Sequence, residues 1–71
     1  MRITKADLEV KEKRVNQLLK KIQLKIAGRY GYTAIDIYEG DRLRDTLISG
    51  LTKREAYNIL DAIETILTLE L

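Results

Sequence analysis

Four carboxylates are the residues of this chain that come closest to an arrangement able to do chemistry. They lie within ten residues of one another and comprise Asp36, Glu39, Asp41 and Asp45. Oxygen ligands of this kind suit hard divalent cations. Their spacing matches no EF-hand loop, however, and solvated carboxylates around a hairpin turn are far more common. We therefore expect no metal site and no other cofactor.

Few other residues of the chain could take part in catalysis. The sequence has no histidine and no cysteine, which removes histidine-dependent triads, thiol nucleophiles and the common zinc sites. Ser49 is the single serine, and no motif places a base beside it. Neither a P-loop nor a glycine-rich dinucleotide motif is present. We expect that the protein is not an enzyme and that it has no catalytic residues.

Basic residues concentrate in the first part of the chain. Residues 1–29 carry nine lysines and arginines against three acidic residues, and residues 30–71 carry four against eight. Such asymmetry marks either a surface for nucleic acid or two parts of a fold that attract each other. A nucleic-acid-binding module would contact phosphates through Lys20, Lys21, Lys25 and Arg29 and stack bases on Tyr30 and Tyr32. Because the net charge of the whole chain is only +2, this is the alternative interpretation.

The tyrosines favour a protein partner instead. All four aromatic residues of the chain are tyrosines, the amphipathic type that is enriched at protein interfaces. Tyr57 is expected to flank the core. The surface that we expect to bind a protein combines the other three with nearby basic residues, and it comprises Tyr30, Tyr32, Tyr38, Arg42, Arg44, Lys53 and Arg54.

Two helices are marked by the same start signal. Thr4 precedes Asp7, and Thr52 precedes Glu55, by the three residues of a capping box. Apolar residues then recur at helical spacing, which predicts helices that begin at Thr4 and Thr52, the first of which ends at residue 20. Lys53 and Arg54 occupy the first turn of the second helix, where cations oppose the helix dipole. Folding does not explain that pair, so both residues stay candidates for binding.

Three strands are expected between the helices. Residues 22–28 alternate apolar and polar side chains, which predicts a strand, although Ile22 and Ile26 would also continue the first helix. A hairpin follows, with its turn at residues 39–41. A two-residue turn at Gly40–Asp41 would place Asp36 opposite Asp45, a like-charge pair. A three-residue turn places Asp36 opposite Arg44, and we expect that register.

The expected architecture is a single α+β domain over residues 1–71, with the element order α-β-β-β-α. The antiparallel sheet carries both helices on one face, and its buried face is expected to comprise Ile22, Leu24, Ile26, Ile35, Ile37, Leu43 and Leu47. A chain of this length buries only about 60% of its unfolded surface. We therefore expect a partner-bound or self-associated state, such as a homodimer. The longest apolar run is two residues, so we expect no membrane contact and a cytoplasmic location.

Residues 28–63 also resemble a set of small uncharacterised proteins encoded by bacteriophages and prophages. The resemblance rests on Tyr30-Gly31-Tyr32, on Gly50 followed by Lys53-Arg54-Glu55 and Tyr57, and on the earlier segment 15–18. The chain departs from that pattern in a short link after the first helix and in having Gly40 as the only glycine of the hairpin turn. The resemblance implies an accessory role in phage biology, in the host cytoplasm, and carries no catalytic residues.

Overall fold

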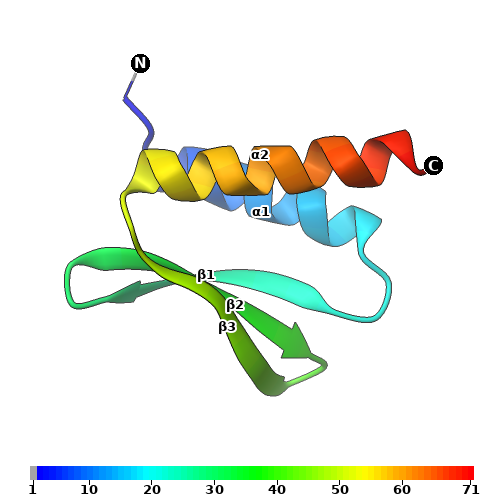
Figure 1. Cartoon of the computed structure of the whole chain (residues 1–71), viewed down its shortest axis with the longest axis horizontal. Coiled ribbons are helices and arrows are strands. Elements are labelled where there is room, and N and C mark those ends of the chain that lie inside the picture. Colours follow the sequence, from blue (N-terminus) through cyan, green and yellow to red (C-terminus); the bar gives the residue numbers. More distant parts are fainter. Residues whose placement is uncertain (1) are drawn as a thin grey trace.

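Two helices and a three-stranded antiparallel sheet follow one another in the predicted order (Figure 1). The computed structural model describes residues 2–71. Its elements are α1 (Lys5–Leu18), β1 (Gln23–Arg29), β2 (Tyr32–Glu39), β3 (Arg42–Leu51) and α2 (Lys53–Leu69). Residues 23–29 form a strand, so the alternative of a continued first helix is wrong. α1 ends two residues earlier than expected. Neither helix is long and apolar enough to span a membrane, as far as residues 2–71 are concerned.

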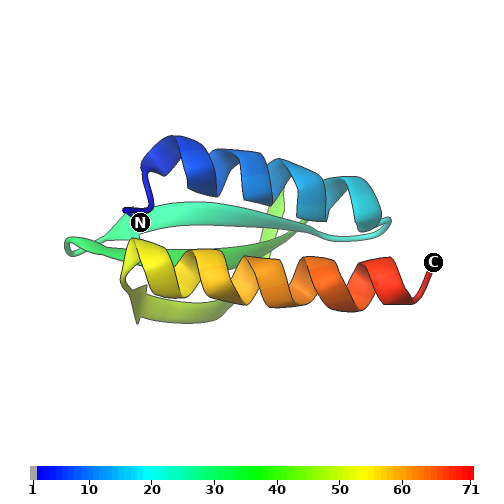
Figure 2. The same cartoon turned by 90° about the horizontal axis from the view of Figure 1, so that it is seen from above.

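Both predicted capping boxes are present. The backbone N–H of Asp7 donates to Thr4 Oγ1 at 3.2 Å, and that of Glu55 donates to Thr52 Oγ1 at 3.1 Å. Each carboxylate accepts from the backbone N–H of its capping threonine in return, at 2.9 Å. This backbone hydrogen bond from Thr52 lowers the pKa of Glu55 below its usual value. The two helices run parallel, with their N-termini at the same end of the molecule (Figure 2).

The core lies between the helices and one face of the sheet. Seven buried residues form it, namely Leu8, Val15, Leu24, Ile35, Leu51, Ala56 and Leu60. Ile26, Ile37 and Tyr57 pack against this cluster while half-buried, as the sequence predicted for Tyr57. The expectation for Leu43 and Leu47 is wrong, since each is 47% exposed. Ile22 precedes β1 and is not part of the cluster.

The register between β2 and β3 differs from the prediction. The turn has two residues, so that Glu39 pairs with Arg42 and Tyr38 with Leu43. A bulge then shifts the register by one residue, and Asp36 lies opposite Thr46 instead of Asp45. The inserted residue removes the like-charge clash that had argued against this turn.

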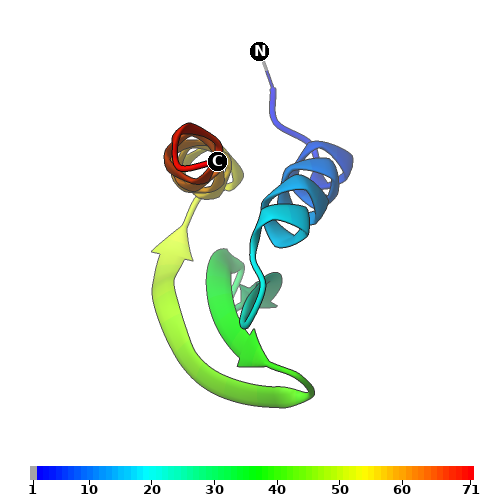
Figure 3. The same cartoon turned by 90° about the vertical axis from the view of Figure 1, so that its right-hand side faces the viewer.

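Further register shifts follow along β3. Each bulge adds a residue to one strand and increases its bend and twist. β3 accordingly curls strongly, and its hairpin end turns away from the helices (Figure 3). Leu43 misses the core because it pairs with Tyr38, on the face of the sheet away from the helices. Leu47 misses it because it is the extra residue of the bulge between Thr46 and Ile48.

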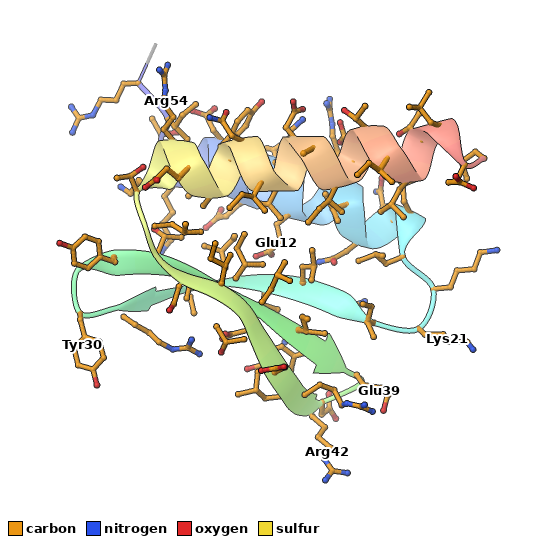
Figure 4. The ribbon with its side chains drawn as sticks, viewed as in Figure 1. Glu12, Lys21, Tyr30, Glu39, Arg42 and Arg54 are labelled. Atoms are coloured by element: carbon orange, nitrogen blue, oxygen red, sulfur yellow. The ribbon has the colours of Figure 1, made fainter. Side chains whose placement is uncertain are left out.

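The free edge of β1 is closed by side chains of α1. Asn16 accepts from the backbone N–H of Leu24 at 2.8 Å through Oδ1 and donates to its carbonyl at 2.9 Å through Nδ2. Glu12 Oε2 accepts from the backbone N–H of Ile26 at 2.7 Å, and Figure 4 shows Glu12 between α1 and the sheet. Because an open edge offers hydrogen-bonding groups to another strand, these contacts prevent the sheet from growing past β1.

We expect Asn16→Ala to destabilise the protein by about 2 kcal/mol, because it leaves two backbone groups of Leu24 without partners. The loss should appear despite the better helix propensity of alanine. Urea unfolding followed by circular dichroism measures it. Gln17→Ala, at an exposed position of the same helix, is the control and should change the free energy of unfolding by less than about 0.5 kcal/mol. Equal effects of the two substitutions would contradict the edge-sealing role.

A buried lysine joins the two helices. Lys11 is only 6% exposed, and its Nζ contacts Asp61 Oδ1 at 2.9 Å and Glu64 Oε1 at 3.2 Å. The same amine lies 5.1 Å from the ring centroid of Tyr57, within cation–π range. The hydrogen bond to Asp61 raises the pKa of Lys11 above its usual value of 10.5, helped by Glu64 and opposed by burial.

This shift predicts a pH dependence. A raised pKa in the folded state stabilises the protein fully below pH 10.5, and that contribution disappears as the pH rises through the folded-state pKa. Below pH 10.5, Lys11→Met should therefore be less stable than the wild type by about 2 kcal/mol. The difference should shrink above that pH, as measured by urea unfolding between neutral and strongly alkaline pH. Lys13→Met, at an exposed position, should show a pH-independent difference, and a constant gap for Lys11→Met would disprove the assignment.

Candidate binding surface on the open face of the sheet

Neither helix packs on the face of the sheet that points away from them (Figures 1 and 3). Alternation along the strands places a second set of side chains there. The paired positions include Lys25 with Asp36, Arg29 with Tyr32, and Asp36 with Thr46. This face therefore gathers charged and aromatic side chains where the opposite face gathers the core.

A closed polar cluster lies at the centre of this face. Asp36 is only 2% exposed, and Arg29 Nη2 donates to its Oδ2 at 2.5 Å. Thr46 Oγ1 donates to Asp36 Oδ1 at 3.0 Å and accepts from Arg29 Nη1 at 3.3 Å. A buried carboxylate requires such partners, because desolvation without compensation is costly. The cluster fixes the guanidinium of Arg29 and balances its charge.

A hollow opens beside this cluster. It has a volume of about 330 Å³ and is lined by Arg29, Tyr30, Tyr32, Thr46, Ser49 and Gly50. Arg29 and Thr46 supply fixed polar groups, whereas Tyr32 is 58% exposed and presents an aromatic ring. The combination of an aromatic wall and a few fixed polar groups is typical of binding sites. Its size suits one or two side chains of a partner.

Tyr30 stands at the rim in a strained conformation. It is 100% exposed and forms the β1–β2 turn together with Gly31, with φ values of +54° and +79°. Positive φ at both central positions is the type I′ pattern, in which asparagine or glycine is preferred at the first position. Tyrosine there costs on the order of 1 kcal/mol. In Figure 4 its side chain projects away from the helices. The fold thus bears a cost to expose this ring completely.

The expected protein-binding surface is divided among separate places. Tyr30 and Tyr32 line the hollow. Arg42 lies at the hairpin tip (Figure 4), beside Arg44, which pairs with Glu39 at 3.0 Å. The structure does not bring these hairpin residues together with Tyr30.

The remaining members of that set lie outside the hollow. Tyr38 is on the same face of the sheet, where the amine of Lys25 lies 4.3 Å from its ring centroid. Lys53 and Arg54 begin α2 on the helical side of the molecule (Figure 4). Lys53 lines a second, smaller hollow of about 250 Å³ with Lys5 and Gly28. Only Tyr30 and Tyr32 of the predicted surface therefore share one site.

The residues of the nucleic-acid alternative are divided as well. Lys21 and Tyr30 lie at opposite ends of the molecule (Figure 4), and Lys20 directly precedes Lys21. Lys25 faces the ring of Tyr38, and Arg29 is paired with Asp36. No continuous basic stripe joins these four residues to the exposed tyrosines.

Several members of the site were missed in the sequence. Asp36 was expected to face Arg44, but it pairs with Arg29 and Thr46. Thr46 and Ser49 reach the site only because the bulges shift β3 along β2, and no local pattern indicates those bulges. The four hairpin carboxylates do not assemble either, since residues 2–71 contain no group of three side chains able to hold a metal ion.

Comparison with known proteins does not assign the chain to a family. No protein family model matches the chain, and neither curated proteins nor solved structures give a significant match. The resemblance to phage-encoded proteins stays a prediction.

We expect Tyr30→Asn to stabilise the protein by about 1 kcal/mol, because asparagine tolerates positive φ and the tyrosine ring is fully exposed. Thermal and urea unfolding measure the change. Tyr32→Asn is the matched control: it lies in β2, where asparagine is a poor strand former, and it should not stabilise. A loss of stability in Tyr30→Asn would show that the ring makes stabilising contacts instead of being held ready for a partner.

Proposed function

We propose that the protein is a non-enzymatic binding module that binds another protein through the open face of its sheet. The observation that carries the proposal is Tyr30, a fully exposed aromatic residue in a strained turn at the rim of a hollow. Backbone strain is retained where it serves a function. Tyrosine and arginine are also the residue types that contribute most to binding energy at protein interfaces, and Arg29 and Tyr32 line the same hollow.

The charges of this face support a protein partner over nucleic acid. Arg29 is balanced by Asp36, and Lys25 lies against the ring of Tyr38. Phosphate binding depends on cations that are free to replace counterions. A face whose two cations already have partners is better suited to the mixed polar and aromatic surface of a protein.

The edges of the sheet support recognition by side chains. α1 seals the edge of β1, and the bulges distort β3. Both devices are used by proteins to prevent strand addition. A partner would therefore dock on the face of the sheet and not extend it.

The resemblance to phage and prophage proteins suggests where the module acts and in which process. The module would act in the host cytoplasm as an accessory protein that binds a host or phage protein. Inhibition of a host defence or regulatory protein is one concrete form of this role.

Site-specific photo-cross-linking in bacterial cells tests the proposal. A benzophenone amino acid replaces Tyr30 in one variant and Val10, an exposed residue of α1, in the control. We expect position 30 to form a discrete adduct with one protein, and position 10 to form none with it. Tyr30→Asn, which should remain folded, should weaken binding to the captured partner at least tenfold.

Two results would overturn the proposal. Adducts to nucleic acid from position 30, with binding that weakens steeply as salt rises, would favour the alternative function. Unchanged affinity of Tyr30→Asn for the captured protein would show that the open face is not the binding surface.

A further inference from the structure

The flank of α2 that faces away from α1 carries an unusual stripe of apolar residues. Ile59, Ala62, Ile66 and Leu69, which we call the outer stripe, follow the 3-4-3 spacing of a coiled-coil seam. Ile66 is 62% exposed and Leu69 is 80% exposed, whereas Ile59 is half-buried and also packs against the core cluster. These four positions lie roughly 150° around the helix axis from the residues that contact Lys11. In Figure 2 the flank opposite α1 is not covered by any other helix among residues 2–71.

Between Ile59 and Leu69 the outer stripe carries no charge of its own, and Glu55 and Glu70 lie at its two ends. From Asn58 to Leu69 the only charged residues are Asp61 and Glu64, and both contact Lys11 on the α1 side. α1 is different, since its exposed positions include Lys5, Glu9, Lys13 and Arg14. One helix thus has an ordinary solvated face, whereas the other presents an apolar flank.

The outer stripe is complementary to itself. If a second α2 runs antiparallel across a two-fold axis near residue 64, Ile59 meets Leu69 of the other copy, and Ala62 meets Ile66 of the other copy. The small residue thereby faces a large one, as packed cores require. A parallel pair would set Ala62 against Ala62 and leave a gap, and its helix dipoles would repel. Self-complementarity about a two-fold axis is the property that a symmetric dimer interface needs.

We propose that a second copy of this chain docks on the outer stripe, so that the protein is a dimer built on an antiparallel pair of α2 helices. The surface area agrees with this. The chain exposes 5365 Å², whereas a monomer of 8.2 kDa is expected to expose about 4,500 Å². The exposed side chains of Ile66 and Leu69 contribute to this excess, and an interface of standard size takes about 800 Å² from each partner.

The adjoining edge of the sheet extends the apolar area. Ile48 of β3 pairs with the buried Ile35 and therefore lies on the helical face of the sheet, yet it is 38% exposed. The open face around Tyr30 points away from the helices (Figure 4). Dimerisation would leave that face free and present it twice, which raises avidity for a multivalent partner.

Sedimentation equilibrium tests the dimer. We expect the wild type to be dimeric, and Ile66→Asp to weaken association at least about 100-fold because a charge would enter an apolar interface. Val10→Asp is the matched control, since Val10 is 55% exposed on α1, and it should remain dimeric. Circular dichroism checks that both variants are folded. A wild type that stays monomeric up to about 1 mM, or a folded Ile66→Asp that stays dimeric, would overturn the proposal.

Disulfide trapping tests the antiparallel register. The chain has no cysteine, so introduced thiols have no competitors. Mild oxidation of an equimolar mixture of Ala62→Cys and Ile66→Cys should give the mixed disulfide in preference to either homodimer. Val10→Cys mixed with Ile66→Cys should give only background cross-linking. Predominant 62–62 or 66–66 cross-links would contradict the antiparallel register.

Discussion

The buried amine of Lys11 is the interaction on which the arrangement of the two helices depends. α1 and α2 run parallel on one face of the sheet, so their dipoles oppose close approach. The amine binds two carboxylates of α2 and lies near the ring of Tyr57, which offsets that repulsion locally. Both charges in the middle of α2 therefore lie on the side that faces α1 and are separated from the outer stripe.

Both edges of the sheet are protected against pairing with another strand, each in a different way. At β1, side chains of α1 occupy the backbone groups that another strand would use. At β3, bulges bend the strand instead. The same bulges carry Thr46 to Asp36 and place Ser49 beside Arg29. The device that protects one edge thus also builds the hollow on the open face.

Local sequence patterns were sufficient to predict the helices and strands, but not the register in which the strands pair. The capping boxes at Thr4 and Thr52 fix the helix starts, and the alternation around Leu24 identifies β1, because these patterns depend only on neighbouring residues. The turn between β2 and β3 could not be derived in the same way. Its like-charge clash is relieved by an inserted residue, an option that simple pairing rules do not include.

The candidate site was only partly accessible to sequence reasoning, for the same reason. Tyr30 and Tyr32 were identified from their type, whereas Asp36, Thr46 and Ser49 depend on tertiary register. The role of Lys11 was also missed in the sequence. A signal was nevertheless present, since Lys11 lies three residues after Leu8 and four before Val15, both of which are buried. A lysine inside an apolar stripe indicates a buried ion pair when the facing helix carries acids at helical spacing, as Asp61 and Glu64 do.

Two costs are left uncompensated in the isolated chain, and they lie on opposite sides of it. One is the strained and exposed Tyr30 on the sheet side, and the other is the exposed apolar flank of α2 on the helical side. A domain with so small a core has little stability to spare. Such features persist where a bound state recovers the free energy that they cost. Because the open face and the outer stripe do not overlap, one surface can serve self-association while the other remains available to a different protein.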